Sequence, residues 1–327
     1  MYLATLNGMA MKLKHALLTL LLGALWISCN NDDDGGVPGT VVPPRDLAEV
    51  AEEDEAAIQE FLQTHFYNYE EFQNPPADFD FQIVIDTIAG DNADKTPLSQ
   101  QVNSRTIVLS PEDLDLDQAD VDVPHTFYYL SAREGAGIQP TTGDSVLLRY
   151  RGTFLDGVAF DAIPNYSWQI LPFFLRGYRE AMTHFSSATE DSFVINPDGT
   201  TEYTNNGVGL LIIPSGLGYF NDTRQVPAFS PLIFTVDVGR VIENTDSDGD
   251  TVPNFMEDVD GDGDYLNDNT DRDWERANFR QLIADFQDSD DDADGIPTAD
   301  EVDVVNGVVT FRDSDGDGTP DHLDADS

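Results

Sequence analysis

The spacing of apolar residues predicts one helix and two short strands in the first third of the chain. Across residues 47–67 apolar positions recur every three or four residues, while the other positions are strongly acidic, which indicates an amphipathic helix. Apolar residues alternate across residues 79–85, which predicts a strand, and residues 105–109 are its expected partner. Residues 112–122 are predicted to form an acidic loop.

The pattern changes to short alternating segments and turns over residues 126–243. Gly143-Asp144 and Asp156-Gly157 are typical of hairpin turns, and residues 176–185 have the helical spacing of this part. Further strands are expected at residues 209–213 and 232–238. Antiparallel strands with one helix predict an α+β fold class.

Composition limits the function classes. The 327 residues suggest two or three domains, and 40% apolar residues are enough to build a core. With 16 basic and 62 acidic residues the net charge is −46, which repels nucleic acid and attracts cations. A nucleic-acid partner is therefore excluded as a main function. One cysteine excludes an intramolecular disulfide and a cysteine zinc cluster.

The amino terminus has the pattern of a secretory signal. Lys12 and Lys14 precede an apolar run at residues 16–27, which is too short to span a bilayer. The run ends in Ser28-Cys29, which resembles a bacterial lipobox with Cys29 as the lipidated residue. An ordinary cleaved signal that leaves a free thiol is the alternative. We expect residues 1–29 to be a lipoprotein signal peptide.

Residues 30–46 are rich in Asp, Gly and Pro and are predicted to be a flexible tether. The acidic run after Cys29 resembles the surface-export signal of lipoproteins of the Bacteroidetes group. The resemblance implies a cell-envelope, outer-membrane lipoprotein that meets the membrane through its lipid anchor. Both orientations, periplasmic-facing and surface-exposed, stay open.

Half of the net charge lies in residues 244–327, where 27 acidic residues face four arginines for a net of −23. This shift marks a domain boundary near Glu243. Acidic residues recur at alternate positions of twelve-residue loops, and such a pattern supplies the six to eight oxygen ligands that Ca²⁺ prefers. The expected ligands are Asp246, Asp248, Asp250, Glu257, Asp258, Asp260, Asp262, Asp290, Asp292, Asp294, Glu301, Asp313, Asp315, Asp317 and Asp324.

Three further features describe this acidic segment. The four loops are residues 246–257, 258–269, 290–301 and 313–324, numbered first to fourth. The second loop has Asn269 at its twelfth position, which makes it the weaker one. A proline follows position 7 in several loops, as in Val252-Pro253, and this resembles the thrombospondin type 3 repeats of secreted proteins. Near-helical spacing over residues 274–286 predicts one packing helix between the loops. A disordered acidic tail is the alternative.

Four segments of residues 126–243 resemble, in the same order, the FK506-binding-protein family of peptidyl-prolyl isomerases. They are LRYRGTFLDGVAFDA, FFLRGYREAM, IPSGLGYF and VPAFSPLIFTVDV. The resemblance implies a roughly five-stranded antiparallel sheet wrapped round one helix, with an apolar pocket between them. Carried over to this chain, the pocket residues are Tyr150, Phe160, Asp161, Phe174, Leu175, Tyr178, Tyr219, Val226 and Phe234.

The resemblance has two departures. Tyr178 stands where the family usually has Trp, which makes the pocket floor smaller and adds a hydroxyl. Residues 183–208 are longer than the family needs and suggest a hairpin with its turn at residues 196–199, either a lid or a decoration. Trp168 is expected as a further pocket wall.

The residue types suit prolyl isomerisation. The barrier of about 18–20 kcal/mol comes from amide resonance, so the reaction needs no nucleophile or cofactor, only a dry site that prefers the twisted amide. Phe160, Tyr178 and Phe234 would grip the prolyl ring. In the family's pattern, Tyr219 and the backbone at Leu175 would hydrogen-bond the flanking carbonyls. Asp161 would lie beside Tyr150 and face the carbonyl of the residue before proline.

The sequence thus predicts an envelope prolyl isomerase in five parts. Residues 47–125 form a helical accessory region, residues 126–243 the isomerase domain and residues 244–327 a loop-rich calcium-binding region. Expected partners are proline-containing polypeptide clients and macrolide-type inhibitors, with Ca²⁺ as a structural ion. The alternative is a non-catalytic peptide-binding or holdase lipoprotein whose calcium module mediates contacts.

Overall fold

The computed structural model describes residues 42–119 and 121–327. The signal peptide, Cys29 and residues 30–41 of the tether lie outside the described residues, so their roles stay predictions. Within the described ranges, no helix combines the length and the apolar content needed to cross a membrane.

The first helix, α2 (Leu47–Thr64), confirms the helical spacing at the start of the folded part. The carboxylate of Asp46 caps it by accepting a hydrogen bond from the backbone N–H of Glu49 at 3.0 Å. The helix ends three residues before the predicted boundary, because His65–Tyr67 forms strand β1. Its buried apolar face consists of Leu47, Val50, Ile58, Phe61 and Leu62.

The strand predicted over residues 79–85 is mostly wrong. Only β2 (Ile85–Thr87) is a strand, and it pairs with β1 rather than with residues 105–109. Phe79 and Phe81 instead lie in a loop and pack against each other with ring centroids 4.9 Å apart. Both also contact Phe72 of α3 (Tyr69–Gln73), so these aromatic residues are used in a local cluster rather than in a sheet.

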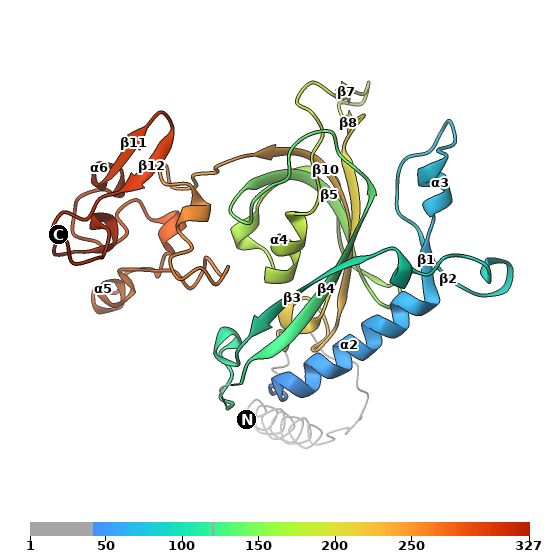
Figure 1. The fold of residues 1–327 in the computed structure, drawn as a ribbon, viewed down its shortest axis with the longest axis horizontal. Helices are drawn as coiled ribbons and strands as arrows, with labels where there is room; N and C mark the ends of the chain where they lie inside the picture. The colour runs from blue at the N-terminus through green and yellow to red at the C-terminus, as the bar shows by residue number, and fades with distance from the viewer. Residues whose placement is uncertain (1–41, 120) are drawn as a thin grey trace, which may run out of the picture. The chain divides into compact units, whose positions relative to one another are not determined.

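An antiparallel sheet of six strands forms the centre of the described chain, with the order β3-β4-β9-β10-β5-β6 (Figure 1). The strands are β3 (Asn103–Leu109), β4 (Val123–Arg133), β5 (Ser145–Phe154), β6 (Ala159–Ile170), β9 (Gly207–Ile213) and β10 (Leu232–Ile242). The sixth strand, beyond the five expected, is β3. It pairs with β4 and forms one edge of the sheet, although it falls within the range assigned to the accessory region.

Of the hairpin turns predicted at Gly143-Asp144 and Asp156-Gly157, the second is confirmed. Asp156-Gly157 connects the paired strands β5 and β6, with Gly157 at a φ of 81°, where a residue without Cβ is unstrained. Gly143-Asp144 is not a hairpin turn, because β4 pairs with β3 and β9 while β5 pairs with β6 and β10.

Helix α4 (Arg176–Met182) lies in the curve of the sheet, beside β5 and β10 in Figure 1. It is shorter than the predicted helix, which ran to residue 185. The longer segment that follows contains the predicted hairpin, formed by β7 (Phe193–Ile195) and β8 (Thr201–Tyr203). Its turn has Gly199 at a φ of 86°.

The sheet is covered on both faces, and β9 shows this best because all seven of its residues are buried. Side chains alternate along a strand, so Leu211 and Ile213 pack into the core with α4. Leu210 and Ile212 pack into a second core with α2. Each fully buried aliphatic side chain contributes about 1.5–3 kcal/mol, so both layers stabilise the central strands.

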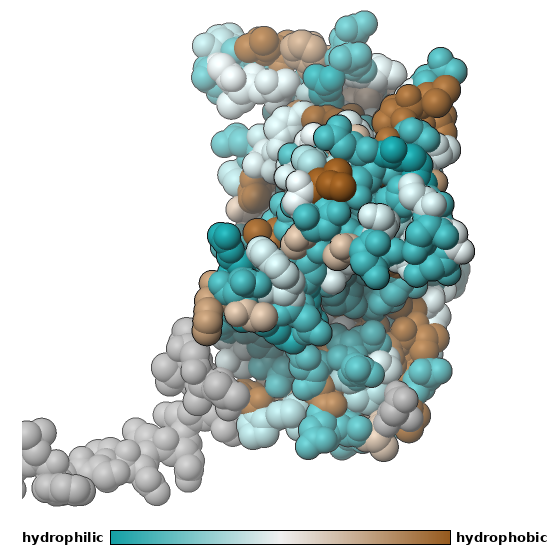
Figure 2. All heavy atoms as spheres, turned by 90° about the vertical axis from the view of Figure 1, so that its left-hand side faces the viewer, coloured by the Kyte–Doolittle hydropathy of each residue, from teal (hydrophilic) through white to brown (hydrophobic). Residues whose placement is uncertain are grey.

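Residues 244–327 are mostly loops, with short elements α5 (Arg272–Ala277), α6 (Thr298–Glu301), β11 (Val302–Val305) and β12 (Val308–Phe311). The helix predicted over residues 274–286 is wrong beyond Ala277. Phe279 has a φ of 55°, which no α-helix allows, and its side chain is 97% exposed. Figure 2, which faces this end of the described chain, shows a mostly hydrophilic surface with separate hydrophobic patches.

A buried carboxylate joins the accessory region to the sheet. Asp54 of α2 is buried and accepts hydrogen bonds from the backbone N–H and the hydroxyl of Ser215 at 2.7 and 2.6 Å. Burial raises the pKa of Asp54 to about 6, while the hydrogen bonds from Ser215 oppose that rise. Ser215 begins the loop that follows β9, so this contact fixes α2 against one end of the sheet.

We expect Asp54 to make the fold less stable as the pH rises from about 4 to about 7. Its folded pKa of about 6 lies above the unfolded value, so the contribution is fully present below pH 4 and is lost as the group ionises in the fold. The difference corresponds to roughly 3 kcal/mol. The check is the free energy of unfolding of wild type minus that of Asp54→Asn, which should fall across this range. A difference that is constant or rises with pH contradicts the assignment.

Candidate functional site

Two neighbouring strands present the central residues of the predicted pocket. In the register of β10 with β5, Phe234 lies opposite Gly152 and Val236 lies opposite Tyr150. Residues two apart on a strand share a face, so these four positions face the same side of the sheet. Phe234 and Val236 belong to the core that contains Tyr178 of α4, which places this face toward the helix.

Phe234 is the centre of the aromatic cluster. Its ring centroid lies 5.1 Å from that of Tyr178, 5.6 Å from that of Phe160 and 5.9 Å from that of Tyr150. The interplanar angles of 67°, 87° and 58° are the tilted and edge-to-face arrangements that aromatic pairs prefer. The structure therefore brings together, around one ring, residues that come from β5, β6, β10 and α4.

Gly152 makes room for one of these rings. A Cβ added to Gly152 would lie 2.6 Å from Cζ of Phe160, well inside van der Waals contact. The absence of a side chain on β5 thus lets the Phe160 ring lie across the strand and against Phe234. We did not predict Gly152 as a site residue, and the signal was the glycine between alternating residues of a strand.

Tyr150 and Asp161 form the polar edge of the cluster. The Tyr150 hydroxyl donates a hydrogen bond to Oδ2 of Asp161, and Oδ1 of Asp161 accepts one from the backbone N–H of Ala162 at 2.8 Å. Burial raises the pKa of Tyr150, and the Asp161 carboxylate raises it further. Asp161 is exposed, so its carboxylate faces solvent next to an apolar surface.

Tyr178 forms the floor of the cluster from α4. Its side chain is buried, and its hydroxyl donates to Oε1 of Gln169 at 3.0 Å. Burial raises the pKa of Tyr178 well above its ordinary value, so the hydroxyl is neutral at physiological pH. Gln169 is a second residue that sequence reasoning missed. The available signal was Tyr178 itself, because a buried Tyr hydroxyl needs a hydrogen-bond acceptor.

The remaining predicted residues lie around this centre. Phe174 has its ring centroid 5.8 Å from that of Tyr178, and Leu175 and Val226 belong to the same apolar cluster. Tyr219 packs there too, and its hydroxyl donates to Oε1 of Gln225 at 3.0 Å. Burial, and after it the charge of nearby Asp161, raises the pKa of Tyr219. All nine predicted pocket residues therefore lie in one region of the structure.

Trp168 is not part of this region, contrary to the expectation from the sequence. It pairs with Leu147, whose side chain faces away from the core that holds its neighbours Val146 and Leu148. The Trp168 side chain is 45% exposed. It therefore lies on the other face of the sheet and cannot form a wall of the aromatic cluster.

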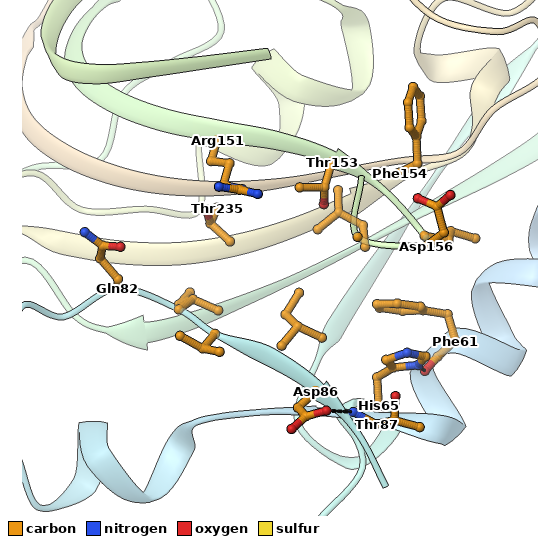
Figure 3. A pocket seen from close by; sticks show the side chains of 16 residues that line it. Phe61, His65, Gln82, Asp86, Thr87, Arg151, Thr153, Phe154, Asp156 and Thr235 are labelled. Carbon is orange, nitrogen blue, oxygen red and sulfur yellow. Dashed lines mark hydrogen bonds between the residues drawn. The ribbon is translucent and has the colours of Figure 1, made fainter. Parts of the chain in front are cut away.

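A separate cavity of about 450 Å³ lies where the accessory region meets the outer face of the sheet (Figure 3). It is lined by Phe61 and His65, and by residues of β2, β5 and β10 such as Asp86, Arg151 and Thr235. Figure 3 shows Arg151 and Thr153 pointing toward it from β5. Because Arg151 alternates with Tyr150 and Gly152, this cavity is on the opposite face from the aromatic cluster.

Helix α4 also contacts the acidic segment. A guanidinium nitrogen of Arg176 donates to the backbone carbonyl of Asp262, and one of Arg179 donates to that of Gly263. Arg179 is buried and forms an ion pair with Asp264 at 3.5 Å. The helix that carries the cluster floor is therefore held by the second acidic loop.

The predicted aspartates of the acidic loops are grouped in space. Within each of three loops, one carboxylate oxygen of each aspartate lies within 4.8 Å of the others: Asp246, Asp248 and Asp250; Asp258, Asp260 and Asp262; Asp290, Asp292 and Asp294. In the fourth loop Asp313 accepts hydrogen bonds from the backbone N–H of Gly316 and Gly318 at 2.7 and 3.2 Å. Asp315 and Asp317 accept bonds from backbone N–H groups two residues on.

The acids at the twelfth positions behave differently from one another. Both carboxylate oxygens of Glu257 are buried without a hydrogen-bond partner, as is Oε2 of Glu301. Burial, together with nearby carboxylates, raises the pKa of Glu257 to about 10 and that of Glu301 to about 7. Asp324 also has a buried oxygen without a partner. Asn269, which we expected to be the weak position, donates to Glu275 at 2.8 Å instead.

Sequence reasoning missed four carboxylates that lie in groups of three. Asp291 lies with Asp250 and Glu257, while Asp271, Glu275 and Asp288 form a group of their own. None of the four falls on an alternate position of the loop pattern, so spacing alone did not select them. The signal for Asp291 was an extra aspartate between two positions of a loop that is already complete.

Comparisons with known proteins give limited information. No protein-family model and no curated protein sequence matches the chain. Among solved structures, it is similar to a peptidyl-prolyl cis-trans isomerase from Pseudomonas syringae pv. tomato, at 21% identity and a TM-score of 0.29. That match covers 35% of this chain and 74% of the other.

The chain is also similar to two further solved structures, FkpA and a domain of FKBP42. FkpA from Escherichia coli is 24% identical with a TM-score of 0.29, over 35% of this chain and 47% of FkpA. The N-terminal domain of FKBP42 from Arabidopsis thaliana is 16% identical with a TM-score of 0.28, over 36% of this chain and 87% of that domain. TM-scores this low do not establish a common fold, so the function is inferred from the residues of the site.

We expect Gly152→Ala to displace the Phe160 ring from Phe234 and to destabilise the protein by about 1–3 kcal/mol, because the added methyl overlaps the ring. Chemical denaturation measures the loss, and the NMR shifts of the aromatic protons report the displacement. Gly218→Ala is the matched control, since its Cβ would meet no atom closer than 3.4 Å. Equal effects from both substitutions would show that Phe160 does not depend on Gly152.

Proposed function

We propose that residues 126–243 catalyse the cis–trans isomerisation of X-Pro bonds in polypeptide clients, as members of the FK506-binding-protein family do. The observation that carries this proposal is the aromatic cluster around Phe234, between the sheet and α4, with the Tyr150–Asp161 pair at its edge. The four sequence segments that resemble the family supply the residues of this cluster.

The cluster suits the energetics of the reaction. Rotation about the X-Pro bond breaks amide resonance, and the twisted amide is less polar than the planar one. An apolar aromatic surface that excludes water binds the twisted form better than the planar form, and only such differential binding accelerates the reaction. The site has no need to form or break a covalent bond, so the task of these residues is binding and orientation.

Each residue then has a specific task. Phe160 and Phe234 contact the prolyl ring, and Tyr178 limits the depth to which the ring enters. The Tyr219 hydroxyl, which is bound to exposed Gln225, exchanges that partner for a carbonyl of the client. Asp161 keeps the Tyr150 hydroxyl oriented and faces the carbonyl that precedes proline.

The alternative function is binding without catalysis, as a peptide-docking or holdase protein. Tyr178 favours this alternative to some degree, because its hydroxyl is already bonded to Gln169 and the floor is smaller than an indole would make it. Turnover of a proline tetrapeptide by the full chain distinguishes the two functions. A holdase suppresses aggregation of an unfolded client without accelerating the proline-limited step of its refolding.

We also propose that the acidic loops bind Ca²⁺ as structural ions. Carboxylate oxygens that are buried without hydrogen-bond donors, in Glu257, Asp292 and Glu301, support this proposal, because an unpaired buried charge costs several kcal/mol. A donor set made only of oxygens fits a hard cation. When bound, calcium would supply positive charge that lets these loops remain folded at neutral pH.

The anchoring proposal concerns Cys29, which lies outside the described residues. We expect Cys29→Ala to move the protein from the membrane fraction to the soluble fraction, since lipidation of this residue is the proposed attachment to the outer membrane. Fractionation and metabolic labelling with a fatty acid measure the change. Cys29→Ala protein that stays with the membrane and keeps its label would contradict a lipid at this position.

We expect Phe160→Ala to lower kcat/KM on a proline tetrapeptide by about tenfold or more, because it opens the aromatic surface that contacts the prolyl ring. Tyr219→Phe removes one hydrogen bond, and we expect it to lower kcat/KM by up to about tenfold. Trp168→Ala is the matched control, since this exposed aromatic residue lies on the opposite face of the sheet. Circular dichroism establishes that the variants fold.

Rates that do not change with Phe160→Ala, or that fall equally with Trp168→Ala, would contradict the proposed site. The rate should also vary little between pH 6 and 8, because no residue gains or loses a proton in the mechanism. A bell-shaped profile with a pKa near neutrality would indicate proton transfer instead.

A further inference from the structure

Three carboxylates from two different acidic loops meet in the interior of residues 244–327. Asp250 and Glu257 are the fifth and twelfth residues of the first loop, and Asp291 is the second residue of the third. One oxygen of each lies within 4.8 Å of the others. Their exposed fractions are 2%, 2% and 1%, so water does not solvate them.

These carboxylates have almost no hydrogen-bond donors. Both oxygens of Glu257, both of Asp291 and Oδ2 of Asp250 are buried without a partner. Oδ2 of the neighbouring Asp248 is in the same state. No ion pair of the described part of the chain includes Asp250, Glu257 or Asp291. The group is therefore a buried concentration of negative charge without compensation from the protein.

Asp291 has no role in its own loop. The loop pattern of the third repeat uses Asp290, Asp292 and Asp294, which form a separate group. Asp291 lies between the first two of these in sequence, and its carboxylate lies with the first loop instead. Its backbone N–H donates to the hydroxyl of Thr298 at 3.3 Å, while both of its carboxylate oxygens are buried without a hydrogen-bond partner.

Electrostatics requires a counter-charge at this point. An unpaired carboxylate in a low-dielectric interior is costly, and three within 4.8 Å of one another repel strongly. A divalent cation removes the repulsion and satisfies the oxygens together.

We propose that Asp250, Glu257 and Asp291 bind one calcium ion that is shared between the first and third acidic loops. The ligands are all carboxylates, which offer up to six oxygens without nitrogen or sulfur, and Ca²⁺ accepts such a shell in flexible geometry. Mg²⁺ fits less well, because it retains several waters and demands a near-octahedral shell.

The shared ion joins parts of the segment that the chain itself does not connect closely. The first loop is fastened to the sheet region, where the Asn254 side chain donates to the carbonyl of Gly143 at 2.9 Å and the Ser145 N–H donates to Thr245 at 2.8 Å. The third loop follows some 30 residues later. Through Asp291, the ion fixes that later part of the acidic segment to the anchored first loop.

This inference rests on the proposal that the acidic loops bind calcium, and the test separates the two. The full chain is freed of metal with a chelator, and calcium is added while bound ions are counted by equilibrium dialysis. We expect Asp291→Asn and Glu257→Gln each to bind one ion fewer than wild type. Asp273→Asn is the matched control, since its exposed carboxylate belongs to no buried group and its count should not change.

Thermal unfolding gives a second, independent readout with opposite signs. Without metal, Asp291→Asn should raise the melting temperature by a few degrees, because it removes one of the repelling charges. With saturating calcium, Asp291→Asn should lower the melting temperature relative to wild type, because one bound ion is lost. A structural role alone would lower the melting temperature under both conditions.

Each result decides between the two proposals. Wild-type protein that binds no calcium overturns both. Wild type that binds calcium, with Asp291→Asn binding the same number of ions, overturns the shared site and leaves the individual loops. If an equal concentration of magnesium displaces calcium from the shared site of wild type, the assignment of this site to calcium is overturned.

Discussion

The buried guanidinium of Arg179 makes the interaction on which the contact between the aromatic cluster and the acidic segment depends. It lies on α4 and donates to the carbonyl of Phe174 at 3.1 Å within its own region. In the acidic segment it donates to the carbonyl of Gly263 and forms an ion pair with the carboxylate of Asp264 at 3.5 Å. It also lies over the Tyr265 ring, with Cζ 5.6 Å from the ring centroid. A buried arginine is stable only when such acceptors surround it, since desolvation lowers its pKa and costs several kcal/mol.

Local patterns along the chain predicted much of this arrangement. The family resemblance predicted that Tyr150 and Phe234 lie together, and the residues Asp156-Gly157 predicted the turn between β5 and β6. The register of β10 with β5 puts both side chains on one face of the sheet. The residues of the family-like segments gather around Phe234 for that reason. Helix α2 was equally predictable from the sequence, because apolar residues that recur every three or four positions form one buried face of a helix.

Features that depend on partners far along the chain were not predictable. Residues 105–109 read as a strand in isolation, but nothing local shows that they pair with β4 rather than with residues 79–85. The helix expected over residues 274–286 stops early because Asn269 and Glu275 bind the backbone and each other around Ile283, which holds the chain in a loop. Asp291 fits no spacing rule, since its neighbours come from another loop.

The aromatic cluster and the acidic loops are packed against each other through helix α4. Helix α4 has seven residues, too few to be stable in water without tertiary contacts. The sheet supports its Tyr178 side, while Asp262 and Gly263 accept the hydrogen bonds of its two arginines on another side. A chain cut at residue 243 would leave those guanidinium groups without these acceptors, and the helix that carries Tyr178 would lose its contacts with residues 262–264. The activity proposed for the aromatic cluster is for this reason expected of the whole chain, with the charge state of the acidic loops as one of its determinants.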